Sequence, residues 1–177
     1  MLADTFGILP LHPPVIGMKK LIFCCIMMLV AHDALAQCHT QATYREDGTT
    51  VESAEMKPVA TTRDMQLAFS VSTNGDGYFV TVGMRHRTFA QDVTGSLNLF
   101  TTDGQALELE YINSQRAQIG GSPLLLAVYQ LEEQDFSKLL RSPLRTVNFR
   151  TSWEMHSLSV DMNSGVLQEQ LGCFLSN

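Results

Sequence analysis

The chain has 177 residues, of which 45% are hydrophobic and 17% charged, and its formal net charge at pH 7 is −6. This acidic balance argues against a nucleic-acid partner, because phosphate binding needs a concentrated basic face. The sequence contains no internal repeat, no low-complexity tract and no Pro-rich linker, so it favours a single globular domain.

The first predicted element is a signal peptide over residues 18–36. Lys19 and Lys20 supply its positive start, and residues 21–31 form an uncharged apolar run. A membrane-spanning helix needs roughly 20 apolar residues, and this run is shorter. We therefore expect a removable leader and no membrane span.

The end of the leader is indicated by Ala34 and Ala36, whose small-x-small spacing is what a leader peptidase accepts. Cleavage is expected between Ala36 and Gln37. Residues 1–17 are an unusual preface to a leader, so we interpret them as an upstream mis-start and expect translation to begin at Met18. The mature domain would be periplasmic or secreted.

Two cysteines remain after cleavage, Cys38 and Cys173. In an oxidising compartment such a pair most simply forms one disulfide. Closing so long a loop contributes about 5 kcal/mol in the chain-entropy model. An alternative stays open, because residues 35–38 resemble a lipoprotein box in which Cys38 would carry a lipid anchor. Gln37 departs from that pattern, since a small residue is expected at its position.

The mature chain begins with a polar, Thr-rich stretch over residues 37–64, for which we expect an irregular or loosely paired N-terminal arm with a turn at 47–48. Residues 65–71 then alternate apolar and polar side chains with the period of a half-buried strand. The Asn-Gly and Asp-Gly pairs within 74–77 favour positive φ angles and predict a hairpin to a second strand over 78–84.

The clearest signal lies at residues 96–112. Leucines alternate on both sides of Asp103-Gly104, which predicts two antiparallel strands joined by a tight turn. After the break at Gly120-Gly121, residues 123–131 are nearly continuous in apolar side chains. That pattern predicts a strand buried more completely than the others.

A short helix is predicted within residues 132–143. Phe136, Leu139 and Leu140 have i, i+3 and i+4 spacing, and Pro143 ends the pattern. The acidic residues lie at the start and the basic residues at the end, as the helix macrodipole favours.

Alternation resumes over 144–152, and a further strand is expected over 153–160. Residues 166–171 carry a helical stripe, with Ser164 as the expected N-cap and Gly172 near the end. The elements together predict an all-β, antiparallel sandwich over residues 65–177, with one short inter-strand helix and a C-terminal helix.

The segment YQLEEQDFSKLLRSPLRTVNFRTS resembles a segment of uncharacterised exported bacterial β-sandwich proteins, in which a Tyr-x-Leu strand end leads into a short helix and another strand. Those proteins also carry an upstream Asp-Gly hairpin flanked by leucines and a closing helix near a Cys. The resemblance covers roughly residues 67–175. It implies a fold and a compartment, and no catalytic residue.

The histidines of the mature chain are His39, His86 and His156, and their spacing fits no zinc site. His86 lies between Arg85 and Arg87, whose charges would repel a cation, so we expect it on a solvated strand face.

Three further patterns favour structural roles. Residues 74–77 lack the ligand ladder of a calcium loop and indicate a turn. Glu108 and Glu110 alternate with leucines, so both are expected in water rather than in an acid–base pair. Ser122 follows two glycines without a nucleophile elbow. We therefore predict no catalytic residue, no cofactor and no metal site.

Aromatic side chains on a sheet can stack on sugars, and we take Trp153 and Tyr129 as a candidate surface for a ligand or partner, with packing in the core or at its rim as the alternative. The sequence favours a non-enzymatic binding or interaction module with a protein or glycan partner in the cell envelope. The alternatives are a purely structural or stress-related envelope protein and, least favoured, an envelope hydrolase.

Overall fold

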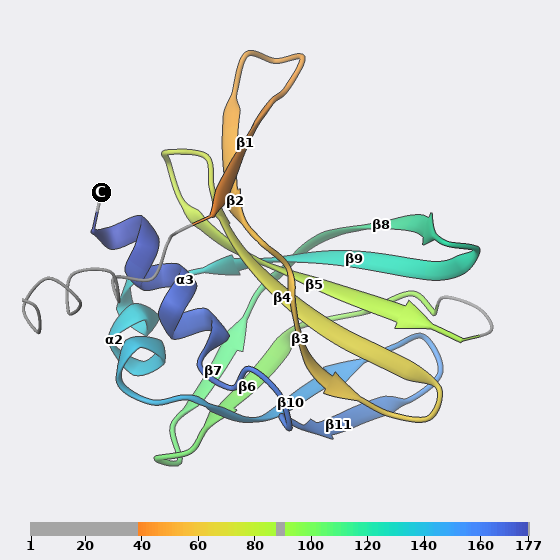
Figure 1. Cartoon of the computed structure of the whole chain (residues 1–177). Coiled ribbons are helices and arrows are strands. Elements are labelled where there is room, and N and C mark those ends of the chain that lie inside the picture. The colour runs from red at the N-terminus through yellow and green to blue at the C-terminus, as the bar shows by residue number, and fades with distance from the viewer. Residues whose placement is uncertain (1–38, 88–90, 177) are drawn as a thin grey trace, which may run out of the picture. The chain divides into compact units, whose positions relative to one another are not determined.

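The strands of this chain form two antiparallel sheets, seen in Figure 1, in a computed structural model that describes residues 39–87 and 91–176. The larger sheet has seven strands in the order β1-β2-β4-β5-β9-β8, with β3 also paired to β4. Its strands are β1 (Thr40–Tyr44), β2 (Thr50–Ala54), β3 (Lys57–Thr61), β4 (Met65–Thr73), β5 (Tyr78–His86), β8 (Tyr111–Ile119) and β9 (Ser122–Leu131).

The smaller sheet has four strands in the order β11-β10-β6-β7. They are β6 (Leu97–Thr101), β7 (Ala106–Leu109), β10 (Leu144–Arg150) and β11 (Met155–Ser159). The predicted antiparallel sandwich is confirmed. The hairpins predicted at 74–77 and at Asp103-Gly104 are confirmed too, as the β4–β5 and β6–β7 connections.

The core lies between the sheets, because alternate side chains of every central strand point inward. Each fully buried aliphatic or aromatic side chain contributes roughly 1.5–3 kcal/mol by leaving water. The side chains that are 0% exposed include, from the two sheets, Phe69, Val71, Val80, Val82, Leu125, Tyr129, Leu97, Leu99, Val147 and Phe149.

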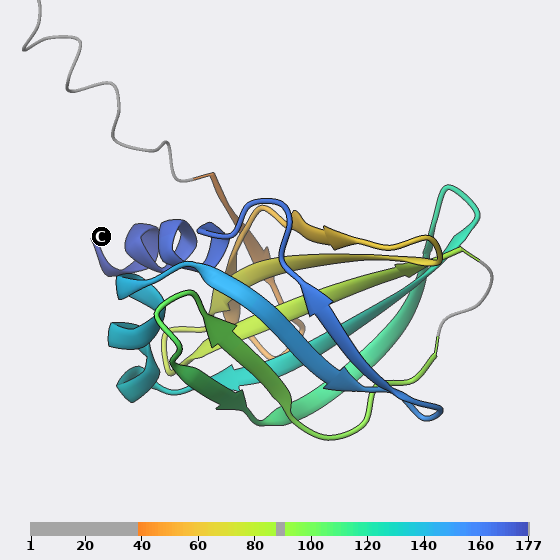
Figure 2. The same cartoon turned by 90° about the horizontal axis from the view of Figure 1, so that it is seen from below.

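Two helices, α2 (Glu133–Arg141) and α3 (Val166–Leu175), lie together at one end of the sandwich, as Figure 2 shows. The short inter-strand helix is therefore confirmed. The ring of Tyr78 joins them, because it meets Phe136 of α2 edge-on at 4.9 Å and Phe174 of α3 at 6.3 Å between ring centroids.

The buried side chain of Gln170 ties α3 to the large sheet where β2 gives way to β3. Its Oε1 accepts a hydrogen bond from the backbone N–H of Val71 at 2.8 Å, and its Nε2 donates to the carbonyl of Glu55 at 2.7 Å. Gln170 thus satisfies backbone groups that the break between β2 and β3 leaves without a strand partner.

The expectation of an irregular arm is wrong over the described residues 39–64, because β1, β2 and β3 all lie there; the arm is paired, as the alternative allowed. Every residue of β1 is exposed, so no apolar alternation marks it. β1 is held by backbone pairing, which polar side chains do not prevent, whereas β3 also buries Val59 and Ala60 in the core. The edge strand β8 was not predicted beyond residue 112, because its side chains there are exposed or half-buried and show no alternation of apolar and polar residues.

The C-terminal helix is confirmed, but its predicted ends are not. Its N-cap is Gly165, and Gly172 lies inside the helix. Ser164 makes no side-chain cap; instead its carbonyl accepts a hydrogen bond from the N–H of Leu144 at 2.8 Å, which fastens this loop to β10.

Candidate functional site

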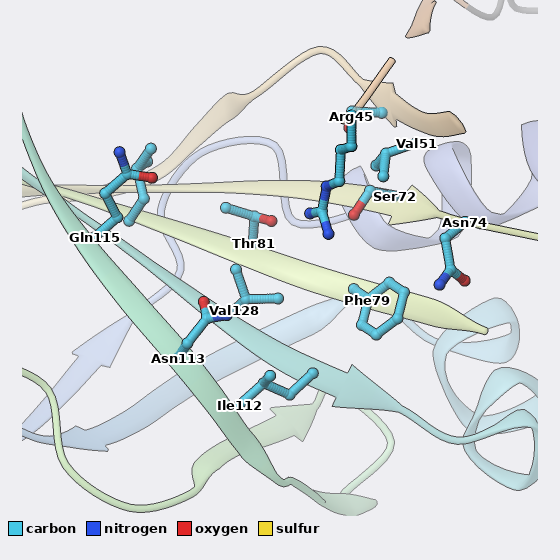
Figure 3. A pocket seen from close by; sticks show the side chains of 12 residues that line it. Arg45, Val51, Ser72, Asn74, Phe79, Thr81, Ile112, Asn113, Gln115 and Val128 are labelled. Carbon is cyan, nitrogen blue, oxygen red and sulfur yellow. The ribbon is translucent and has the colours of Figure 1, made fainter. Parts of the chain in front are cut away.

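The outer face of the large sheet carries a groove with a volume of about 340 Å³. Figure 3 shows its side chains on the central strands, with the β1–β2 hairpin on one side and β8 on the other. It is lined by Arg45, Val51, Ser53, Ser72, Asn74, Phe79, Thr81, Ile112, Asn113, Gln115, Leu126 and Val128.

The floor of the groove consists of outward-facing residues in cross-strand rows. In one row Thr81 of β5 is paired with Val128 of β9, which is paired in turn with Asn113 of β8. In the next row Leu126 is paired with Gln115. Hydroxyl, amide and aliphatic groups therefore alternate across the floor, and Thr81, Val128 and Leu126 stay partly exposed.

Met56, from the connection between β2 and β3, borders this floor. It lies over Gly83, where an added Cβ would come within 2.5 Å of the methionine Sδ and 3.6 Å of Leu126. The missing side chain at Gly83 is therefore what lets Met56 pack flat on the sheet beside the groove.

Arg45 stands at the turn of the β1–β2 hairpin, and Figure 3 shows its side chain extending from the hairpin over the floor. Its backbone N–H donates to Thr49 at 2.9 Å and its carbonyl accepts from Gly48 at 3.0 Å. Asp47 accepts from the N–H of Thr49 at 2.9 Å, and this bond chiefly lowers the pKa of that carboxyl. The turn thus fixes the backbone from which Arg45 projects.

Among the described residues that line the groove, Arg45 is the only one with a formal charge. Ion pairs between described residues join other side chains, and none of them includes Arg45. Its guanidinium thus offers a free positive charge above a floor of neutral polar and apolar groups.

Tyr129 packs in the core, so the alternative of core packing holds for it and its candidate role at a surface is wrong. The β9 register places it on the inner face opposite Tyr111, where it is 0% exposed and the two rings meet at 5.9 Å. Burial raises the pKa of its hydroxyl. Trp153 is 69% exposed, but it lies in the connection between β10 and β11 of the other sheet, away from the groove residues.

His86 is buried, which corrects the expectation of a solvated strand face. It pairs with Met65 across β4 and β5, so it points inward and is 7% exposed. Its Nε2 has no hydrogen-bond partner among the described residues. Burial, and secondarily the charge of His156, lower its pKa.

His156 stacks on Phe149 at 4.9 Å, whereas His39 is exposed. Within the described ranges, no group of three or more His, Cys, Asp or Glu side chains could hold a metal ion.

The other sequence candidates have structural roles. Glu108 and Glu110 are both exposed, as predicted, and Glu108 accepts a hydrogen bond from Ser96 at 2.6 Å. Asn74 closes its turn by accepting from the N–H of Gly77 at 3.0 Å. Ser122 accepts from Arg85 Nη2 at 3.0 Å.

The groove itself escaped the sequence interpretation, although one signal pointed to it. The nearly continuous apolar run of β9 predicted a strand buried more completely than the others, and it also places apolar side chains on the outer face of the sheet. There Leu126 and Val128 are only half-buried, because no second layer covers the outer face at the groove.

Cys38 and the leader lie outside the described residues, so the disulfide to Cys173, the alternative lipid anchor and the cleavage site stay predictions. Neither α2 nor α3 has the length and hydropathy needed to cross a membrane, and no other helix is present in the described part of the chain.

No family model matches the chain, and no curated protein or solved structure matches it either. The resemblance to exported β-sandwich proteins therefore remains a prediction.

Proposed function

We propose that the protein is an exported, non-enzymatic binding module that holds its ligand in the groove on the outer face of the large sheet. The observation that carries this proposal is the groove itself. Its volume of about 340 Å³ and its mixed polar and apolar lining are typical of sites for small molecules. The ligand would be free or part of a glycan or protein partner.

The lining favours binding over catalysis. General acid–base chemistry needs a group that titrates near the working pH. The groove residues offer hydroxyls, amides and one guanidinium, which stays protonated at all relevant pH values. These groups can orient a ligand by hydrogen bonds, while the half-buried Phe79, Leu126 and Val128 gain contact area when it binds.

The test is to fill the groove and measure binding of two fluorescent probes, 1-anilinonaphthalene-8-sulfonate and N-phenyl-1-naphthylamine. Thr81→Trp places a large ring on the floor. Thr146→Trp is the matched control, because Thr146 is half-buried on the outer face of β10 in the other sheet. Asn113→Trp, at an exposed edge position, serves as a second block that spares the fold.

We expect a saturable fluorescence increase with at least one probe in the wild type and in Thr146→Trp, and an affinity at least about tenfold weaker in both groove variants. Circular dichroism checks that the variants fold. The proposal is overturned when neither probe binds, or when the groove variants bind as tightly as the wild type.

A further inference from the structure

The charge distribution of the groove restricts what can bind there. Within the described part of the chain, Arg45 contributes the only formal charge of the lining and has no ion-pair partner. A cationic ligand would be repelled. A group with one negative charge would find a planar donor that recognises carboxylate or sulfonate with two parallel hydrogen bonds.

Neither of the two acidic residues that follow Arg45 in the chain, Glu46 and Asp47, forms an ion pair with it. The carboxylate of Asp47 is held in the turn by the N–H of Thr49 at 2.9 Å, and it forms no ion pair with Arg45. Arg45 does help to lower the pKa of Asp47, but only after the hydrogen bonds to Thr49. The guanidinium thus remains available to a ligand.

The rest of the lining suits the uncharged part of such a ligand. Phe79, Leu126 and Val128 are half-buried, and Ile112 is 43% exposed on the β8 side. These side chains gain burial when an apolar body covers them. The amides of Asn113 and Gln115 add hydrogen bonds but no charge, so a second ionic group on the ligand would have no partner.

We propose that the groove selects an amphipathic monoanion, a molecule that places one carboxylate or sulfonate on Arg45 and an apolar body against Phe79, Val128 and Leu126. This inference rests on the proposed function, because it names the ligand class of the same groove.

The test uses the two probes as a matched pair. N-phenyl-1-naphthylamine is 1-anilinonaphthalene-8-sulfonate without its sulfonate, so the two differ by the single charge in question. Both are titrated into the wild type, Arg45→Gln and Arg45→Lys. Arg145→Gln is the matched control, because it removes the same charge from an exposed residue of β10 in the other sheet.

We expect the wild type to bind the sulfonate probe about tenfold or more tightly than the neutral probe. Arg45→Gln should weaken sulfonate binding by a factor of about 10 to 100, the usual range for a lost charge-assisted hydrogen bond. The neutral probe should change less than about twofold. Arg45→Lys should recover part of the lost affinity, because lysine keeps the positive charge but lacks the paired N–H donors of the guanidinium. Arg145→Gln should change neither affinity.

The outcomes separate this inference from the proposed function. If Thr81→Trp and Asn113→Trp abolish binding but the wild type binds both probes equally well, the groove binds ligands and the charge selection is wrong. The same conclusion follows if Arg45→Gln and Arg145→Gln change the affinity for the sulfonate probe alike. When neither probe binds the wild type, both proposals are overturned. Because Arg45 is exposed on a surface turn, its replacement leaves the core untouched, and circular dichroism verifies this.

Discussion

The two faces of the large sheet use the same strands for different purposes. Inward-facing Phe69, Val82 and Tyr129 are 0% exposed and meet the smaller sheet. Outward-facing Thr81 and Val128, on the same strands β5 and β9, remain half-buried and line the groove. The difference teaches that strand alternation separates stability from binding at single-residue spacing, so substitutions on the two faces should have separable effects.

The largest effect is expected from a pair of phenylalanines on opposite faces. Phe69→Ala leaves a cavity in the core and should lower the free energy of unfolding by about 3–5 kcal/mol, as measured by urea denaturation. Phe79→Ala, in the groove, should cost about 1 kcal/mol because its ring is already partly exposed. Equal losses from the two variants would contradict the separation of the faces.

The next largest effect concerns the two hydrogen bonds by which Gln170 of α3 contacts the large sheet. Gln170→Leu removes the partners of the Val71 N–H and the Glu55 carbonyl, and buried backbone groups without partners cost about 1–3 kcal/mol each. We expect a loss of about 2–4 kcal/mol in urea denaturation.

The matched control on the same helix is Gln168→Leu. Gln168 donates to the carbonyl of Leu140 at 3.1 Å in an exposed bond, which water can replace, so the loss should stay within about 0.5 kcal/mol. Similar losses of unfolding free energy for the two variants would show that the buried hydrogen bonds of Gln170 do not stabilise the contact between α3 and the large sheet.

A smaller effect is expected on the outer face at Gly83. Gly83→Ala drives a methyl group into Met56 Sδ and should cost about 1 kcal/mol, because a methionine side chain can move aside. Adding Met56→Ala should remove most of the Gly83→Ala penalty in a double-mutant cycle. An unchanged penalty would mean that the backbone, and not Met56, rejects the methyl group.

The smallest effect is a pH dependence that arises from the inner face. Burial favours the neutral form of His86 and lowers its pKa from the ordinary value of 6.5, so the unfolded chain takes up a proton first as the pH falls. Stability that is present above pH 6.5 should therefore decrease as the pH drops toward the lowered native pKa. Melting temperatures between about pH 7.5 and pH 5.5 would measure this slope.

His86→Leu should make that slope shallower, whereas His39→Leu, at an exposed position, should leave it unchanged. The same slope in wild type and His86→Leu would assign the pH dependence to other groups.

Much of the fold could be predicted because period-two alternation is imposed by burial. The leucines around Asp103-Gly104 and the run at 65–71 face the core, and both hairpins form as expected. Where a strand is held by its backbone alone, as β1 is, its side chains meet water on both faces and leave no periodic signal.

The site could be predicted less well, because it depends on which side chains are left uncovered. Tyr129 was a candidate for a ligand surface, but its register turns it inward. Arg45 follows no motif; it matters because the hairpin folds back beside β4 and holds its charge over Thr81. Such an arrangement depends on long-range pairing, which one strand's pattern does not encode.

The wall of the groove that carries Arg45 is joined to β4 through two residue pairs, Glu52 with Thr73 and Ser53 with Ser72, and through one hydrogen bond that Ser70 Oγ donates to the carbonyl of Ala54 at 2.6 Å. Because this contact is short, the pairing of β2 with β4 should open far more often than the nine-pair ladder between β4 and β5. Deuterium uptake should therefore be fastest along this hairpin, and the rate at which ligands enter and leave should follow its opening rather than any loosening of the interior.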